Sequence, residues 1–189
     1  PEDLDRASNL LIQEGYEIDI DLPYERHLVR EEYNIDLHPV VAPKHLVASL
    51  SNEEIWQNIE QIDLKGTSID NITPEVTLLI LCLHGTKECW LKLNRICDIA
   101  ELVRYTPLLN WNQVMERSHR LGSKRLLLLG LQLAIDLLDA PVPDQIQQQI
   151  KTDKVVQTFH QKIKQRLFNT TPDTIDEIGR SLFHLQLRE

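Results

Sequence analysis

The longest run of regular hydrophobic patterning lies between residues 73 and 105, and it predicts helix. Thr73 is a favoured N-cap residue, Pro74 suits the first helical position, and Glu75 complements the positive end of a helix. The segment from Val76 to Leu83 is almost entirely apolar, which is typical of a helix buried on all sides. We therefore expect this part of the helix to lie inside the molecule.

After Gly85 the same stretch changes to a two-sided pattern. Its apolar positions recur at helical spacing and define one core-facing stripe, formed by Cys89, Leu93, Ile96, Cys97, Ala100 and Val103. If the helix continues through Gly85, the opposite side carries His84, Lys87, Leu91, Asn94, Arg95 and Asp98. A glycine inside a helix costs about 1 kcal/mol relative to alanine, so this polar side depends on the continuity of the helix. The pattern predicts that one side packs and the other presents an imidazole, a lysine, an arginine and a carboxylate.

The N-terminal part of the chain predicts a helix followed by short strands. A helix is expected from Pro1 to Gly15, because acidic residues follow the proline and apolar positions recur at helical spacing. Alternation of apolar and polar residues predicts strands over residues 16–21 and 33–41, with a short strand over residues 27–30 between them. Pro39 indicates that the last strand ends there or lies at an edge. A helix followed by antiparallel strands is typical of an α+β fold.

Two shorter signals precede residue 73. Ser51 with Glu54 three residues later forms a capping-box pattern, which predicts a helix from Ser51 through Gln61. Residues 62–69 are interrupted by Gly66 and predict a hairpin or a loop. A boundary between two parts of the chain is expected near residues 66–71.

The remainder of the chain predicts helices. Asn110 and Ser123 are favoured N-cap residues and Gly122 is a favoured helix end, so helices are expected over residues 111–121 and 123–139. The second of these is apolar nearly all round and should be central in a bundle. More polar helices are expected over residues 144–150, 153–168 and 172–187. The predicted fold is α+β: a small partial mixed or antiparallel sheet with a helix in residues 1–66, followed by a larger all-α helical domain in residues 67–189.

The composition narrows the class of protein. Of 189 residues, 42% are hydrophobic and 26% are charged, which is ordinary for a soluble globular protein. The formal net charge of −9 disfavours a broad nucleic-acid-binding surface, which needs an excess of lysine and arginine. No apolar run reaches the roughly 20 residues that cross a bilayer, so no membrane association is expected. The three cysteines lie in apolar helical sequence, which is typical of reduced thiols in a cytoplasmic protein.

Two features of the chain carry candidate chemistry outside the long helix. Asp36 and His38 are two residues apart on a predicted strand, so both side chains leave the same face. From the residues alone, they are interpreted as a solvent-facing pair on an edge strand. A basic cluster is interpreted first as a solvated helix face and second as a site for an acidic partner. It is formed by Lys151, Lys154, Lys162, Lys164 and Arg166.

The run LLILCLHGTKECWLKLNRICDIAELV, residues 78–103, resembles the signature of the uncharacterised nucleotidyltransferase family, within the polymerase-beta-like nucleotidyltransferase superfamily. Its histidine, glycine, lysine, tryptophan, cysteine and aspartate occur in the order of that signature. Similar residues extend over the segment from Leu4 to Tyr16, the strand YNIDLHPV and the segment NWNQVMERSHRLGSKRLLLLGLQLAIDLL.

The resemblance implies a metal-dependent enzyme that transfers a nucleoside monophosphate from an NTP to an unknown acceptor, with Mg²⁺ as the cofactor. It implies that Asp36 is the third metal-binding carboxylate of the site and that His38 shares its catalytic face. It also implies that His84, Lys87 and Asp98 line the nucleotide or acceptor cleft, where Lys87 would neutralise phosphate.

The chain departs from the family pattern at one place. The first motif of the family is a Gly-Ser turn followed by an Asp-x-Asp strand, and both are expected before the helix that begins at Pro1. The chain's Gly-Ser pair, at Gly122, lies between two predicted helices, and Asp19 and Asp21 form an Asp-x-Asp only after the first helix. Asp19 and Asp21 therefore remain an alternative metal-binding pair, and we expect the chain to be inactive alone. The competing hypothesis is a non-catalytic helical module, derived from this fold, that binds a protein partner.

Overall fold

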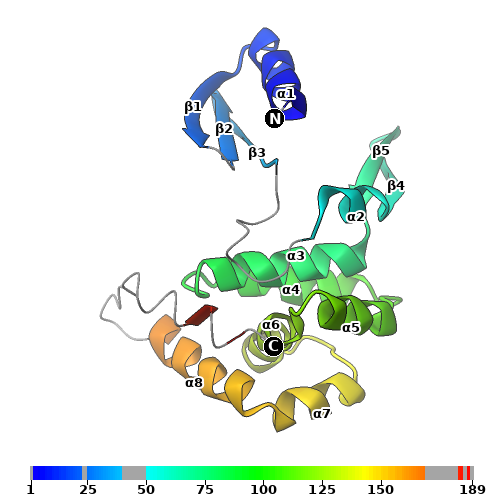
Figure 1. Ribbon diagram of the computed structural model, residues 1–189, viewed down its shortest axis with the longest axis vertical. Helices are drawn as coiled ribbons and strands as arrows, with labels where there is room; N and C mark the ends of the chain where they lie inside the picture. The colour runs from blue at the N-terminus through cyan, green and yellow to red at the C-terminus, as the bar shows by residue number, and fades with distance from the viewer. Residues whose placement is uncertain (1, 23–24, 40–49, 169–182, 185–186, 188–189) are drawn as a thin grey trace.

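The chain begins with a helix beside a three-stranded antiparallel sheet (Figure 1). The computed structural model describes residues 2–22, 25–39, 50–168, 183–184 and 187. Helix α1 spans Glu2–Gln13, and the strands are β1 (Glu17–Leu22), β2 (Glu25–Arg30) and β3 (Tyr33–Leu37), in the order β1-β2-β3. The predicted first helix and three short strands are confirmed, and the sheet they form is antiparallel.

The sheet has one face toward α1 and one face away from it. Leu28 of β2 is fully buried, and its neighbour Arg26 donates hydrogen bonds to Asp5 and Ser8 of α1 at 3.0 Å each. Because side chains alternate along a strand, the residues beside Arg26, which are Glu25 and His27, leave the opposite face. The polar residues of β2 that do not contact α1 are thereby gathered on one open face.

The predicted helix from Ser51 through Gln61 is wrong in its length. The capping box of Ser51 and Glu54 forms, but helix α2 spans only Asn52–Trp56. The chain then forms a hairpin of strands β4 (Ile59–Leu64) and β5 (Thr67–Ile72), in which the segment IEQIDL pairs along its whole length with β5. Lys65 and Gly66 both have positive φ, at 54° and 85°, as a tight two-residue hairpin turn requires. The predicted boundary between residues 66 and 67 falls in this turn, and the division into two domains stays a prediction.

The C-terminal part of the chain is helical and is built around one central helix. Helix α6 packs against five other helices and is buried along most of its length, as its nearly all-round apolar sequence predicts. Figure 1 shows it end-on, with the neighbouring helices around it. The helices are α3 (Pro74–Lys87), α4 (Asn94–Tyr105), α5 (Trp111–Arg120), α6 (Lys124–Leu138), α7 (Asp144–Thr152) and α8 (Lys154–Phe168). The α+β class with a larger helical part is thus confirmed.

The last predicted helix, over residues 172–187, lies outside the described residues apart from Phe183, His184 and Leu187. Phe183 and Leu187 are buried against the helical core.

The long predicted helix is broken in its middle. It runs through Gly85 as assumed, but α3 ends at Lys87 and α4 begins only at Asn94. Cys89 and Trp90 have φ values of 52° and 57°, in the left-handed region that ends helices. The Trp90 N–H donates to the Gly85 carbonyl at 2.8 Å and the Cys89 N–H to the Thr86 carbonyl at 2.9 Å, the hydrogen-bond pattern of a Schellman motif.

The break places the Trp90 ring in the core between two glycines. Trp90 is fully buried. A Cβ atom at Gly85 would lie 2.3 Å from Cζ3 of the ring, and one at Gly130 of α6 would lie 3.0 Å from Cη2. The ring therefore fits only because both helices lack a side chain at the point of contact. The glycine inside α3 is explained by the tryptophan that follows it.

The predicted core stripe of residues 89–103 changes with this break. Ile96, Ala100 and Val103 are buried as predicted, and Cys89 is buried through the turn. Leu93, however, is 45% exposed, because it precedes α4 and is not on the continuous helix that the prediction assumed.

Gly85→Ala is predicted to destabilise the protein through the Trp90 ring. The new methyl group would overlap the ring, which should lower the free energy of unfolding by about 2–3 kcal/mol in urea denaturation. Trp90→Leu removes the overlapping ring atoms, so Gly85→Ala should cost less in that background. An equal cost in both backgrounds would contradict the proposed contact.

Candidate metal and nucleotide site

Carboxylate and imidazole side chains from β2 and β3 gather on the open face of the sheet. The antiparallel register pairs His27 directly with Asp36, and His38 follows Asp36 by two residues on the same side. Glu25, Asp36 and His38 each offer one ligand atom, and these atoms all lie within 4.8 Å of one another. Asp36 and His38 are exposed and Glu25 is half-buried, so solvent and ions can reach the group.

His27 connects this group to β1. Its Nδ1 lies 3.0 Å from Asp19 Oδ2, and its Nε2 lies 3.7 Å from Asp36 Oδ1. A bulge between Ile18 and Ile20 turns Asp19 toward the His27 face. The three side chains form a carboxylate–imidazole–carboxylate row that crosses all three strands.

The alternative metal pair, Asp19 and Asp21, does not form one site. Asp21 lies opposite Arg26 and pairs with it at 3.0 Å, on the side of the sheet that faces α1. Asp19 instead faces His27, on the other side. The bulge removes the common face that a spacing of two residues would give on a regular strand.

The last turn of α3 approaches the same group. The ring centroids of His38 and His84 lie 6.5 Å apart, with the planes tilted by 48°. Lys87 follows His84 by three residues on the helix, so both side chains lie on one side of its last turn. Lys87 is half-buried and forms no ion pair within the described part of the chain. Four of the predicted site residues thus lie on two segments that the His38–His84 pair brings together, namely Asp36 and His38 at the end of β3 and His84 and Lys87 in the last turn of α3.

The fifth predicted residue, Asp98, lies on α4, the helix that follows α3. It is exposed, and its charge contributes to the raised pKa of Arg95, after the larger effect of the hydrogen bond from Arg95 to Glu88. Arg95 and Glu88 form a two-pronged pair, with Nη2–Oε1 and Nε–Oε2 distances of 2.6 and 3.1 Å. This pair bridges the connection between α3 and α4. The structure places Asp98 beside that bridge.

Glu25 and His27 belong to the group but were not predicted from the sequence. The sequence feature that could have indicated them is their spacing: they are two residues apart on the strand that pairs with the strand of Asp36. The pairing of His27 with Asp36 depends on strand register, which the short turn at residues 31–32 sets and the local pattern does not.

The donors on the open face suit a divalent cation. The carboxylates of Glu25 and Asp36 are the hard oxygen ligands that Mg²⁺ and Mn²⁺ prefer, and His38 adds a nitrogen ligand that transition metals accept. The ligand atoms are already close enough to converge on one ion without movement of the backbone. Glu25, Asp36 and His38 would hold it.

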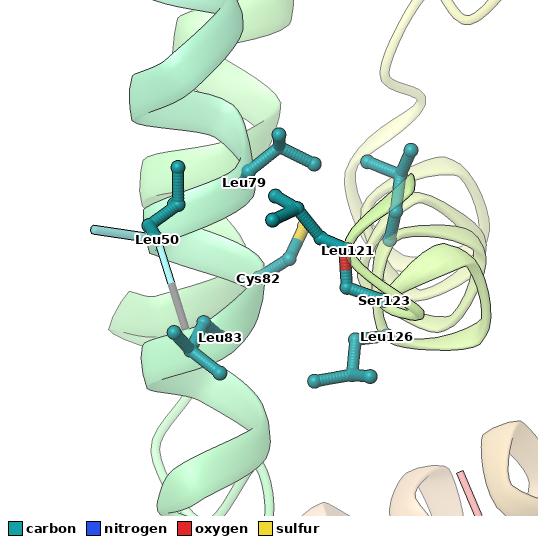
Figure 2. Close-up of a pocket in the computed structure, with 8 residues that line it drawn as sticks. Leu50, Leu79, Cys82, Leu83, Leu121, Ser123 and Leu126 are labelled. Atoms are coloured by element: carbon teal, nitrogen blue, oxygen red, sulfur yellow. The ribbon is translucent and has the colours of Figure 1, made fainter. Parts of the chain in front are cut away.

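The apolar pocket between α3 and the start of α6 offers no comparable chemistry (Figure 2). Its lining is leucine-rich, with Cys82 and Ser123 as the exceptions. Burial raises the pKa of the Cys82 thiol far above its ordinary range, so the thiol is not a nucleophile at neutral pH. The Ser123 hydroxyl donates to the Ser118 carbonyl at 3.2 Å. The side chains of this pocket serve packing.

The predicted basic cluster is not one solvated face. Lys164 pairs with Asp136 at 2.7 Å, and this hydrogen bond, with one from the buried His160, lowers the pKa of Asp136. Arg166 points inward and donates to the backbone carbonyl of Cys89.

No helix in the described ranges is long and apolar enough to cross a membrane.

The fold and the site together define an α+β chain with a carboxylate–imidazole group on a small sheet beside a basic helix end. The family model of the uncharacterised nucleotidyltransferases matches residues 1–139. The chain therefore belongs to this family, and a nucleotidyltransferase-like function with use of divalent metal follows at that coarse level. No curated protein and no solved structure matches the chain.

Glu88→Gln is predicted to destabilise the protein in a pH-dependent way. The hydrogen bond from Arg95 lowers the pKa of Glu88 below its ordinary value of 4.5, so its stabilising effect is present above that value and is lost as pH falls through the folded pKa. The variant should lose about 1 kcal/mol of unfolding free energy at pH 7 in urea denaturation. The difference from the wild type should vanish well below pH 4.5.

The matched control is Glu101→Gln, because Glu101 pairs with Arg104 on the exposed surface of α4. It should change stability little at either pH. Equal effects of the two substitutions would mean that the Glu88–Arg95 bridge has no special role.

Proposed function

We propose that the chain contributes the nucleotide and metal side of a nucleotidyltransferase site, at which a nucleoside monophosphate passes from an NTP to an acceptor. The observation that carries the proposal is the approach of the basic last turn of α3 to the metal-binding group on β2 and β3. A triphosphate is strongly anionic, so a site for it needs cations on more than one side. A divalent ion on the sheet and Lys87 on the helix would supply them.

Each residue has a role that follows from its chemistry. Glu25, Asp36 and His38 would hold the ion, which supplies charge neutralisation and orientation of the phosphates. Lys87, whose ammonium lacks a carboxylate partner in the described ranges, would contact a phosphate oxygen. His84, whose ring lies 6.5 Å from that of His38, would donate a hydrogen bond to the nucleotide or the acceptor. Asp98 would lie on the acceptor side of the site, next to the Glu88–Arg95 bridge.

We propose further that the site is of the polymerase-beta-like type. In a site of that type Asp36 takes the place of the third carboxylate, and Mg²⁺ is the expected ion. His27 would hold the Asp36 carboxylate from the side opposite the ion, as the second layer of a metal site does.

A non-catalytic interaction module is the second candidate, and the exposure of β1 supports it. All six residues of β1 are exposed, including Ile18, Ile20 and Leu22, and the strand lies at the edge of the sheet. Exposed edge strands are ready templates for pairing with another chain. Calorimetric titration separates the candidates: heat with Mg·NTP supports the transferase, and heat only with a protein partner supports the module.

Asp36→Asn is predicted to weaken divalent-ion binding. The substitution removes one of the two carboxylates in the group, so the Kd for Mn²⁺, followed by electron paramagnetic resonance, should rise about tenfold or more. Asp3→Asn is the control, because Asp3 is an exposed aspartate on α1. Similar affinities of all three proteins would show that Mn²⁺ binds elsewhere.

Lys87→Gln is predicted to weaken nucleotide binding. Loss of the ammonium should raise the Kd for Mg·ATP about tenfold in calorimetry, and Lys87→Arg should keep most of the affinity because it keeps the charge. Lys151→Gln, on the exposed side of α7, should have no effect. Unchanged affinity in Lys87→Gln would remove Lys87 from the site.

A further inference from the structure

Two side chains from beyond the family-matched residues 1–139 hold the end of α3. Arg166 of α8 donates from Nη2 to the Cys89 carbonyl. His184 Nε2 lies 3.0 Å from the Thr86 carbonyl oxygen. A carbonyl can only accept, so Nε2 of His184 carries the proton. Both carbonyls flank Lys87, one on each side along the chain.

The two donors are fixed by their own packing. Helix α8 packs against the central helix α6. Phe183 stacks edge-on against Phe159 of α8 with centroids 4.9 Å apart, and the His184 ring lies 5.6 Å from the Phe183 ring. Leu187 is fully buried. Both donors to the end of α3 therefore lie beside side chains that are buried in the helical core.

The end of α3 has an electrostatic disadvantage for an anion. The C-terminus of a helix carries a partial negative charge from its unpaired carbonyl groups, which repels phosphate. The Thr86 carbonyl accepts the Cys89 N–H and receives an imidazole N–H in addition, and the Cys89 carbonyl, just beyond the helix, receives a guanidinium N–H. The positive charge of Arg166 also offsets the helix dipole at the turn that carries Lys87.

We propose that Arg166 and His184 are positioning residues for the nucleotide. They neutralise the carbonyl end of α3 and fix the Thr86–Cys89 turn, so that the last turn of the helix can accept the phosphates of an NTP through Lys87. This inference rests on the proposed function. It assigns a part of the nucleotide site to the C-terminal region that the family model does not cover.

The test uses the full chain and separates charge from hydrogen bonding. Arg166→Gln keeps an N–H donor and loses the charge, and Arg166→Lys keeps the charge. His184→Phe keeps the ring against Phe183 and loses the donor. Arg6→Gln, at an exposed arginine of α1, is the matched control. Thermal unfolding first defines a temperature at which every variant is folded, and Mg·ATP affinity and amide exchange over residues 86–90 are measured there.

Arg166→Gln is expected to raise the Kd for Mg·ATP about tenfold, and Arg166→Lys should stay within about threefold of the wild type. Both Arg166→Gln and His184→Phe should speed amide exchange over residues 86–90, and Arg6→Gln should change neither quantity. If the wild type binds Mg·ATP and Arg166→Gln binds it equally well, the positioning role is overturned while the proposed function stands. If the wild type binds no NTP, the proposed function fails and the positioning role with it. Exchange over residues 86–90 then decides separately whether the two side chains hold the turn.

Discussion

The packing of Trp90 against two glycines is the contact on which the shape of the helical part depends. The ring lies over Gly85 of α3 and Gly130 of α6, where a Cβ atom on either helix would meet its atoms. To reach that place the chain leaves the helix at Lys87 and passes through two non-glycine residues of positive φ. Backbone in this region is unfavourable for residues with a Cβ, so burial of the indole must offset the strain. The turn is therefore determined by the core beneath it.

The same turn determines which polar side chains of α3 lie at its C-terminal end. Because α3 stops at Lys87, its last turn presents His84 and Lys87 at the end of a helix and not along the side of a longer one. The His38 ring lies 6.5 Å from that of His84 there, which joins the N-terminal sheet to the helical part at the candidate metal-binding group. Arg166 and His184 approach the same turn from the C-terminal region. The N-terminal sheet and the C-terminal region thus both contact the six residues from His84 to Cys89.

The sequence was informative where local pattern alone decides the structure. The run from Val76 to Leu83 is mostly buried, as its composition predicts, with Thr77, Ile80 and Leu81 half-buried. Asn110 caps α5 by accepting a hydrogen bond from the Gln113 N–H. Prediction from the sequence failed where a contact with a distant part of the chain overrides the local conformational preference. The sequence around Trp90 does not predict that the helix ends, since the ring packs partly against Gly130 on another helix. Likewise, His27 joined the candidate metal-binding group through strand register, and the helix that Ser51 begins ends at Trp56, shortly before strand β4.

Asp36 and the last turn of α3 form one cation-dependent site if a single bound ion affects both. The most direct measurement is titration of the chain with Mn²⁺, followed by NMR of its seven histidine side chains, because the paramagnetic ion broadens nearby protons. We expect the imidazole signals of His27, His38 and His84 to broaden first, while that of His119 on α5 stays sharp at the same ratio of metal to protein. Equal broadening of all histidines, or broadening that spares His84, would contradict a shared site.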